Sequence, residues 1–444
     1  MSNTVNQTET CGSWEQEYRR RLMSPDEAVK LVKSGDRVYI GTCTSVAYAL
    51  AEALGRRKDE LEDITILSSN VAKPLAVMDP DSDVFHVETY YMGPQERRAA
   101  SRGHADYTSF HLSQTREWVN FVGKPDVAFI EVSEPDRYGH MRYGASGLVA
   151  DPYVMEYADR VVLQVNRCVP RLNGMDNQIR AEQADAIVEV QDPLVEAEDL
   201  PASPVVQKIS EFLVEQIHDG DCFQLGIGGI ASAVGYGLKE KNDLGIHSEM
   251  LGNSMMALMK NGNVTNQKKT FWKGKSAAGF AMGTQELYDF LDENEDVYMA
   301  PSAVVNHPAV IAKNDHMVSV NTALAVDLTG QVTADNIAGR QYSAVGGQLD
   351  FIRGAQMSAH GKSFIAIPST FEKGGEVHSH ITASFRPGTM VTTPRADVEY
   401  VVTEYGCVNL KHLNMKDRVV AMISLAHPMF RETLKDQAKE KGLL

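Results

Sequence analysis

Short apolar runs alternate with helical patterns along the chain, and the order of these elements occurs twice. Val38–Ile40 and Cys222–Leu225 are apolar runs, each preceded by a Gly-Asp pair and followed by glycine. Runs of this length with such boundaries are typical of short buried strands. Stretches rich in small and apolar residues come next, and they predict helices over 46–54 and 231–238.

A helix is predicted before each of these strands. Ser24 is a hydroxyl cap, Pro25 follows at the first turn, and Glu27 completes a capping-box pattern, which predicts a helix to about Val32. Residues 205–217 carry apolar side chains at helical spacing. The helix, strand, glycine turn and helix therefore recur in one order in both parts of the chain.

The parallel continues further along the chain. Ile64–Ser69 corresponds to Leu244–Glu249 as a short strand after the helix, and Asp126–Val132 corresponds to Val318–Val326. Such a repeat indicates two α/β halves of similar topology, produced by a duplication within one chain.

The boundary between the halves is predicted in residues 189–203, where acidic residues and prolines give a linker-like composition. We expect an N-terminal domain over 1–200 and a C-terminal domain over 201–444. A surface loop of the first half is the alternative interpretation of this stretch.

Glu249 is the main candidate for chemistry. The pattern places it just past the end of the second strand of the second half, near the glycine turn that follows Leu225. Ligands of open α/β sheets bind at the carboxyl ends of strands, so this carboxylate is a candidate nucleophile beside backbone N–H groups. The first half has Ser69 at the corresponding place, which assigns the chemistry to the second half. A solvated loop glutamate is the alternative.

Composition narrows the class of protein. The 444 residues are enough for two or three domains, and 43% hydrophobic with 23% charged residues is typical of a globular protein. A formal net charge of -16 argues against nucleic acid or an anionic membrane as partner. Five scattered cysteines suggest neither disulfides nor zinc and fit a cytoplasmic location. No membrane span is expected, and the first dozen residues are expected to be disordered.

Four motifs in fixed order carry a resemblance to a known family. These motifs are Gln224–Gly228, Gly245–Met250, Gly346–Phe351 and Val402–Gly406. With them the sequence resembles the acetyl-CoA hydrolase/transferase family, within which butyrate and 4-hydroxybutyrate CoA-transferases look nearest. The resemblance runs from about residue 17 to the end of the chain and is densest after residue 200.

The resemblance implies a fold of two similar Rossmann-like halves with open, mostly parallel sheets, and it implies site residues. Glu249 is implied as the nucleophile, Gly347 and Asn306 as groups that hold the thioester oxygen, and Glu404 as a residue that positions the nucleophile. The implied coenzyme A contacts are Gln224, Leu225, Gly226, Ile227, Gly228, Gly346, Gly347 and Lys373.

The same resemblance implies acyl-CoA and a short-chain carboxylate as substrates and a homodimer or homotetramer. No permanently bound cofactor and no metal are expected, because coenzyme A is itself a substrate. A glutamate nucleophile would pass CoA through an anhydride and a glutamyl-CoA thioester in ping-pong fashion. An acyl-CoA hydrolase on the same scaffold and a non-catalytic acyl-CoA-binding protein are the alternatives.

Several residues have simpler interpretations when each is considered alone. Gly346 and Gly347 could form an ordinary turn, Lys373 could be a solvated loop lysine, and Glu404 could only end a strand. His247 is expected to be a packed core histidine. The family commonly has Ser-Asp-Gly after the nucleophile, whereas this chain has residues 252–254 as Gly-Asn-Ser, and we expect these to shape the acyl pocket.

Overall fold

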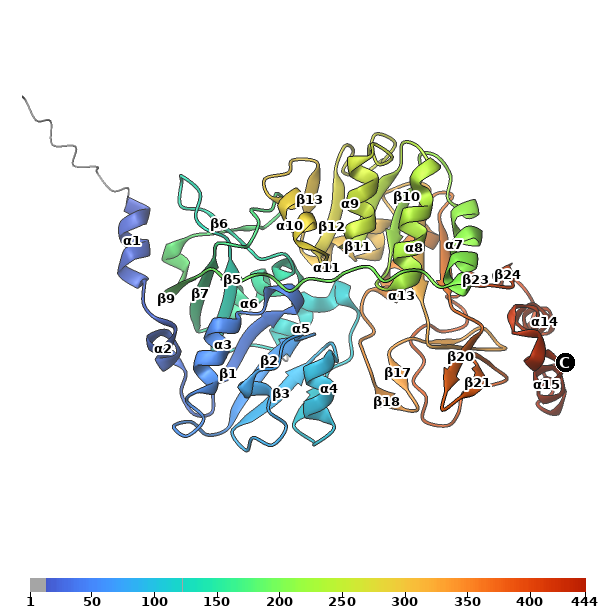
Figure 1. Ribbon diagram of the computed structural model, residues 1–444, viewed down its shortest axis with the longest axis horizontal. Coiled ribbons are helices and arrows are strands. Elements are labelled where there is room, and N and C mark those ends of the chain that lie inside the picture. The colour runs from blue at the N-terminus through green and yellow to red at the C-terminus, as the bar shows by residue number, and fades with distance from the viewer. Residues whose placement is uncertain (1–12, 122) are drawn as a thin grey trace, which may run out of the picture.

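Two α/β halves lie side by side in the computed structural model, which describes residues 13–121 and 123–444 (Figure 1). The predicted disorder of the first dozen residues concerns positions outside the described residues. The first half contains a parallel sheet of seven strands in the order β4-β3-β2-β1-β5-β7-β9. Its strands are β1 (Arg37–Thr42), β2 (Ile64–Ser69), β3 (Phe85–Thr89), β4 (Ala105–Tyr107), β5 (Val127–Val132), β7 (Arg160–Asn166) and β9 (Ala186–Val190).

The second half contains a sheet of eight strands in the order β13-β12-β11-β10-β14-β19-β23-β24. Its strands are β10 (Cys222–Leu225), β11 (Gly245–Leu251), β12 (Ser276–Ala281), β13 (Val297–Met299), β14 (Met317–Thr322), β19 (Lys362–Ala366), β23 (Tyr400–Thr403) and β24 (Gly406–Asn409). Only the β23–β24 pair at one edge is antiparallel. Seven strands of this sheet follow the same order as the first sheet, which confirms the predicted duplication and fold class.

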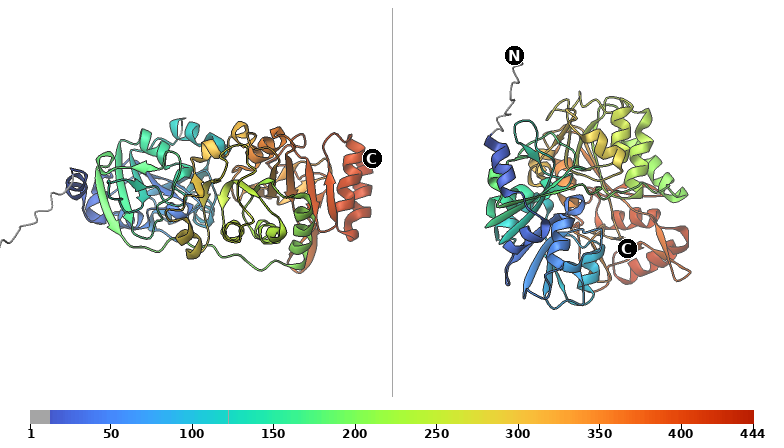
Figure 2. Two further views of the ribbon diagram at one scale, coloured as in Figure 1. Left: turned by 90° about the horizontal axis from the view of Figure 1, so that it is seen from above. Right: turned by 60° about the vertical axis from the view of Figure 1, so that its left-hand side comes forward.

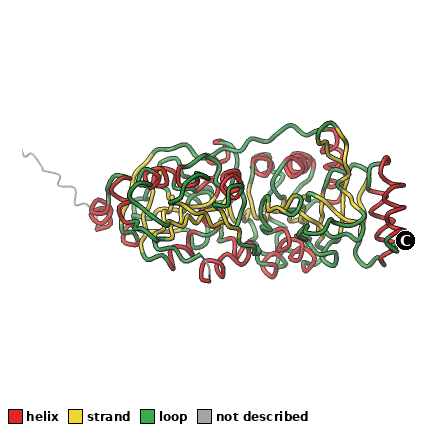
Figure 3. Tube along the Cα trace, turned by 90° about the horizontal axis from the view of Figure 1, so that it is seen from below, coloured by secondary structure: helices red, strands yellow, loops and turns green. Residues whose placement is uncertain are grey.

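Helices cover both faces of the sheets, and Figure 3 shows the strands as a central layer between them. The helices of the first half are α1 (Ser13–Arg21), α2 (Pro25–Ala28), α3 (Tyr48–Gly55), α4 (Pro94–Ala100), α5 (Thr115–Phe121) and α6 (Asp151–Tyr157). Those of the second half are α7 (Pro204–Gln216), α8 (Gly229–Gly237), α9 (Asn253–Lys260), α10 (Gln285–Leu291), α11 (Ser302–Val305), α12 (Pro308–Ile311), α13 (Gln348–Met357), α14 (Met415–Leu425) and α15 (Pro428–Glu440). Within the described residues, no helix combines the length and apolarity needed to cross a bilayer.

Small ladders complete the fold. They are β15 (Ala325–Asp327), β16 (Val332–Thr333) and β22 (Ile381–Thr382) in one sheet, with three two-stranded pairs: β6 (Met141–Arg142) with β8 (Gln178–Ile179), β17 (Asn336–Ile337) with β18 (Arg340–Gln341), and β20 (Thr370–Lys373) with β21 (Glu376–Ser379).

Strands buried on both faces read as continuous apolar runs, and this accounts for the strand positions. Phe129 and Phe223, on central strands of the two sheets, are fully buried. Every residue of β5 is buried, including the charged residue Glu131. An acidic side chain in such a run requires a specific environment.

Two sequence expectations are wrong in detail. The single strand expected over 318–326 is divided, because β15 leaves the large sheet and pairs with β16 and β22. Glu249 does not follow β11 but lies within it, since Met250 and Leu251 continue the ladder with Phe280 and Ala281. The length of such a strand depends on its hydrogen bonds with the neighbouring strand, so it cannot be determined from the strand's own sequence.

A segment of the first half pairs with β13, an edge strand of the second sheet. Met299 of β13 donates its N–H to Asn173 O at 2.8 Å and accepts from the N–H of Met175 at 2.8 Å. Gly174 forms the parallel bridge between these bonds. Residues 191–203 form no helix or strand, and the chain between β9 and α7 runs along the molecule from one half to the other (Figures 1 and 2). The predicted boundary near residue 200 stays a prediction.

Substitution of Gly174 by Ala is expected to destabilise the contact between the halves. A Cβ at this position would overlap the carbonyl of Met299, and backbone would have to move, at a cost of about 2–4 kcal/mol. Gly103→Ala is the control, because that glycine also has a positive φ but nothing lies within 4 Å of the added carbon. Thermal denaturation should show a lower midpoint for Gly174→Ala than for Gly103→Ala; equal midpoints would contradict this role.

Candidate functional site

A pocket opens where the carboxyl ends of strands from both sheets face each other. The second half contributes Ile227, Glu249 and Phe280, which lie on or directly after β10, β11 and β12. The first half contributes residues 42–43, 69–70 and 90–91, which end or follow β1, β2 and β3. Corresponding strands of the duplicated halves therefore meet at one site.

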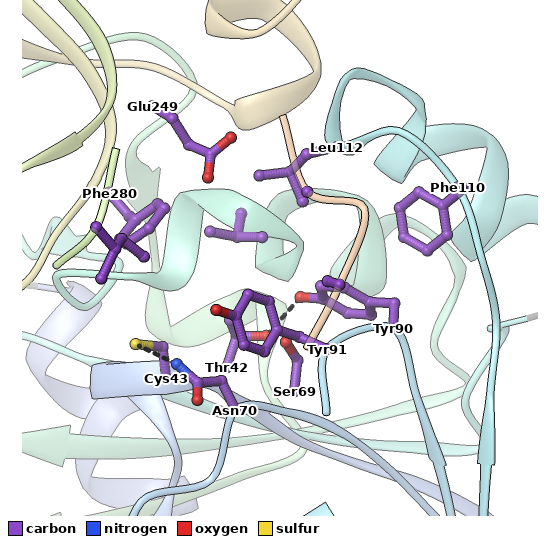
Figure 4. Close-up of a pocket in the computed structure, with 14 residues that line it drawn as sticks. Thr42, Cys43, Ser69, Asn70, Tyr90, Tyr91, Phe110, Leu112, Glu249 and Phe280 are labelled. Atoms are coloured by element: carbon purple, nitrogen blue, oxygen red, sulfur yellow. Dashed lines mark hydrogen bonds between the residues drawn. The ribbon is translucent and has the colours of Figure 1, made fainter. Parts of the chain in front are cut away.

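Figure 4 shows Glu249 on one side of this pocket and residues 42–43, 69–70 and 90–91 of the first half on the opposite side. The cavity measures about 40 Å³. Apolar and aromatic side chains form much of its wall, among them Tyr91, Phe110, Leu112 and Phe280. A pocket of this kind suits a short apolar group rather than a charged one.

Glu249 is held by neutral hydrogen-bond donors. Its Oε2 accepts a hydrogen bond from Asn306 Nδ2 at 2.6 Å, and the backbone of Gly347 supplies another. Asn306 directly follows α11 and is fully buried. A Cβ on Gly347 would overlap both the carboxylate and the amide of Asn306, so this close approach requires glycine.

The environment holds Glu249 partly protonated near neutral pH. Burial raises its pKa to about 7, and the negative charge of Asp350 adds to the rise. The hydrogen bonds from Asn306 and Gly347 act in the opposite direction because they favour the charged form. The side chain keeps some accessible surface only because the pocket reaches it.

The first half fixes the chain segment that carries Gly347. This segment, residues 342–347, runs from β18 to α13. Arg97 Nη1 donates to Tyr342 O at 2.8 Å, and Tyr107 OH accepts from the N–H of Val345 at 3.2 Å. Leu112 donates its N–H to Gly346 O at 3.0 Å.

A further attachment lies directly after this segment, on the first turn of α13. Asp350 accepts hydrogen bonds from the N–H and hydroxyl of Ser113 at 3.0 and 2.8 Å. Both halves thus determine the position of the donor beside Glu249, although only the second half contains the glutamate.

A second cavity, of about 160 Å³, lies at the glycine turn after β10. Residues 225–229 and the start of α8 line it, and Gly228 has a φ of 109°, which favours glycine. Ile227 lines this cavity as well as the pocket of Glu249. Residues 252–254 also line the glycine-turn cavity and not the pocket of Glu249, and their expected role in shaping the acyl pocket stays a prediction.

Three residues implied by the sequence lie elsewhere in the fold. Gln224 is buried and exchanges hydrogen bonds with Asn321 at 3.3 Å. Lys373 is exposed at the end of β20. Glu404, after β23, accepts hydrogen bonds from the N–H and hydroxyl of Ser369. None of the three lines either cavity, and their roles stay predictions.

The histidines are structural or peripheral. His247 is fully buried, donates from Nε2 to Val305 O at 2.8 Å and accepts from Asn314 at Nδ1. Burial lowers its pKa to about 3, so it is neutral. His380 bonds to Pro368 O at 2.8 Å. In the described part of the chain, no cluster of three or more His, Cys, Asp or Glu could hold a metal ion.

Most of the lining residues that sequence reasoning missed belong to the first half: Thr42, Cys43, Asn70, Tyr90, Tyr91, Phe110, Leu112 and Val149. Phe280 and Ala344 of the second half were missed as well. Ser69 was noted only as the counterpart of Glu249. A usable signal existed, because several of these residues lie at the ends of consecutive predicted strands. Their function depends on how the halves dock, which the pattern within either half does not contain.

Comparison with known proteins places this geometry in a family. Residues 2–196 match the acetyl-CoA hydrolase/transferase N-terminal domain, and residues 283–438 match the acetyl-CoA hydrolase/transferase C-terminal domain. The chain belongs to the acetyl-CoA hydrolase/transferase family. The resemblance inferred from the four motifs is thereby confirmed.

Relatives in this family match along nearly the whole chain. A butyryl-CoA:acetate CoA-transferase of Anaerostipes caccae is 38% identical over 96% of this chain and 98% of its own length. A 4-hydroxybutyrate coenzyme A transferase of Clostridium kluyveri is 40% identical over 96% of this chain and 99% of its own length. The crystal structure of RipA from Yersinia pestis superposes with a TM-score of 0.92 at 35% identity, covering 98% of this chain and all of that one.

The ionisation of Glu249 should respond in opposite directions to its two neighbours. Asn306→Ala removes a donor that favours the carboxylate and should raise the pKa above about 7, whereas Asp350→Asn removes a negative charge and should lower it, each by about one pH unit. Infrared difference titration against Glu249→Gln would measure both shifts. Equal pKa values in all three proteins would refute this account of the site.

Proposed function

We propose that this CoA-transferase moves CoA between a short, uncharged acyl group and acetate or a similar carboxylate, with Glu249 as the covalent nucleophile. The observation that carries the proposal is a largely desolvated carboxylate that accepts hydrogen bonds from neutral donors and lines a cavity whose wall shares Ile227 with a second cavity. The butyryl-CoA:acetate and 4-hydroxybutyrate relatives support the substrate class.

In the first half-reaction, a Glu249 oxygen attacks the thioester carbonyl, and the C–S bond breaks to give a mixed anhydride and CoA thiolate. The thiolate then attacks the glutamyl carbonyl carbon and expels the acyl carboxylate, which leaves a glutamyl-CoA thioester. A second carboxylate reverses these two steps and leaves as the new acyl-CoA. No redox change occurs, and each step exchanges one nucleophile for one leaving group.

Asn306 and Gly347 suit the second step in particular. When the thiolate attacks the glutamyl carbon, negative charge develops on an oxygen of Glu249 itself. Asn306 Nδ2 and the backbone of Gly347 already contact this carboxyl group. A preorganised donor of this type typically contributes about 3 kcal/mol to transition-state stabilisation.

Two cavities that share the lining residue Ile227 suggest how acyl-CoA lies. The pocket of Glu249 would take the acyl chain, and the glycine-turn cavity would take the pantetheine arm. Glu198 and Asp199 also line that second cavity, and Asp199 accepts hydrogen bonds from Ser232 and Tyr236 of α8. Carboxylates there disfavour phosphate, so the cavity suits the uncharged arm rather than the nucleotide end.

Replacement of Glu249 by Ala or Gln is expected to lower CoA exchange between labelled acetate and butyryl-CoA by more than about a thousandfold. Hydroxylamine treatment of wild type with acyl-CoA alone should trap the thioester on the peptide containing Glu249, as seen by mass spectrometry. Near-normal exchange by Glu249→Ala would overturn the proposal. Thioester loss that does not depend on added carboxylate would instead identify a hydrolase.

The wall of the acyl pocket should set chain length. Leu112→Ala removes a buried side chain from the wall, while its backbone bond to Gly346 remains. We expect kcat/KM to fall for butyryl-CoA and to rise relative to it for hexanoyl-CoA, by roughly tenfold in the ratio. Phe121→Ala, at an exposed site, is the control. An unchanged preference would exclude Leu112 from the acyl pocket.

A further inference from the structure

A third cavity, of about 220 Å³, lies at the carboxyl edge of the first sheet. The chain places β2, β3 and β4 on one side of β1, and β5, β7 and β9 on the other. Open α/β sheets bind ligands where the strand order reverses, here between β1 and β5. The cavity shares no lining residue with the other two. Its lining residues are Thr44, Tyr48, Ala49, Glu52, Lys73, Glu131, Gln164, Asn166, Asp192, Pro193, Leu194 and Val195.

Glu131 forms the floor of this cavity. It lies on β5 with 3% of its surface exposed. Its Oε1 accepts hydrogen bonds from Gln164 Nε2 at 3.2 Å and Asn166 Nδ2 at 3.0 Å. Its Oε2 is buried and has no hydrogen-bond partner among the described residues. A buried carboxyl oxygen without a partner is costly, so this atom can gain most from a ligand.

The two amides cannot turn their oxygens toward the cavity. Gln164 Oε1 accepts from the N–H of Leu50 at 3.2 Å, and Asn166 Oδ1 accepts from the N–H groups of Cys168 and Asp192 at 3.1 Å. Backbone N–H groups are donors only, which fixes both amides with their NH₂ groups directed at Oε1 of Glu131. Both amides therefore donate to Oε1, and Oε2 is the Glu131 oxygen left to accept a further hydrogen bond.

Charge around the cavity favours a positive ligand. Glu52 and Asp192 add two carboxylates to that of Glu131. Lys73 is the opposing charge, and its ammonium lies 4.9 Å from the centroid of the Tyr48 ring, at an exposed position. A ligand that carries both positive charge and N–H donors would satisfy Oε2 and reduce the excess of negative charge.

We infer that this cavity binds a small primary ammonium cation, with Glu131 Oε2 accepting a hydrogen bond from the ligand nitrogen. When the cation binds, Glu131 loses its proton to solvent and forms an ion pair. The site is independent of Glu249 and of the proposed CoA transfer. Residues 192–195 of its wall lead directly to residues 197–200 of the glycine-turn cavity, which provides a route for a bound ligand to affect acyl-CoA binding.

Proton release gives the inference a specific signature. Burial raises the pKa of Glu131 to about 8, while the two amide hydrogen bonds oppose the rise. Below that pH the ligand must displace a proton, so its affinity should increase about tenfold per pH unit and level off above it. The other titratable groups near Glu131 are Asp192, Lys73, Glu52, Tyr48, Asp151, Cys168 and Tyr288.

Calorimetric titration of the whole protein with methylammonium chloride, between about pH 6 and pH 9, tests the inference. We expect binding, release of about one proton at the lower pH values, and loss of both in Glu131→Gln. Tetramethylammonium has the same charge but no N–H group, and it should bind much more weakly. Glu52→Gln should weaken binding and keep the proton release.

No heat with methylammonium, equal binding by Glu131→Gln, or preferential binding of acetate would each overturn the inference. Circular dichroism would establish whether Glu131→Gln is folded. If it is not, comparison of wild type in phosphate and HEPES, which differ in ionisation enthalpy and contain no primary amine, still measures the proton released. Binding without proton release would exclude Glu131 as the group that pairs with the cation.

Discussion

The site depends on the attachment of residues 342–347 to the first half. Gly347 can touch Glu249 only if its backbone is held against a carboxylate that would otherwise attract water or a cation. Hydrogen bonds of this segment with Arg97, Tyr107 and Leu112 supply that constraint. The halves are therefore specialised in a particular sense: one contains the nucleophile, and the other determines where its hydrogen-bond donor lies.

The carboxylate of Glu249 is largely removed from water, and its hydrogen-bond donors are neutral groups. An arginine or lysine beside it would hold the charge and lower the pKa by about 1–3 units, but it would also weaken the nucleophile. Asn306 and the backbone of Gly347 fix the position of the carboxylate, and they lower its pKa less than a cationic side chain would. Neutral donors thus leave Glu249 near the balance point between its two protonation states at neutral pH.

Much of the fold followed from the sequence, because buried parallel strands and glycine turns leave local patterns. Cys222–Leu225 and Ile64–Ser69 were delimited correctly, and the duplication was visible from element order alone. The exit of β15 from the sheet and the full length of β11 were missed, since the register of neighbouring strands sets both.

The site was predictable only in part. Asn306 and Gly347, which the resemblance implied as holders of the thioester oxygen, contact Glu249, whereas the wall from the first half depends on docking. Tyr91 and Phe110 are ordinary aromatic residues when judged by their local pattern. Whether a residue lines this pocket depends on how its half packs against the other half. The sequences of both halves together determine that packing.

The bridge at Gly174 has a consequence for the evolution of this architecture. An outermost strand presents unpaired backbone groups to any other extended chain, and it is a common starting point for aggregation. Here residues 173–175 of the first half cover β13 at the edge of the second sheet. Loss of the first half would expose this edge strand to other extended chains, which would favour retention of both repeats in a single polypeptide.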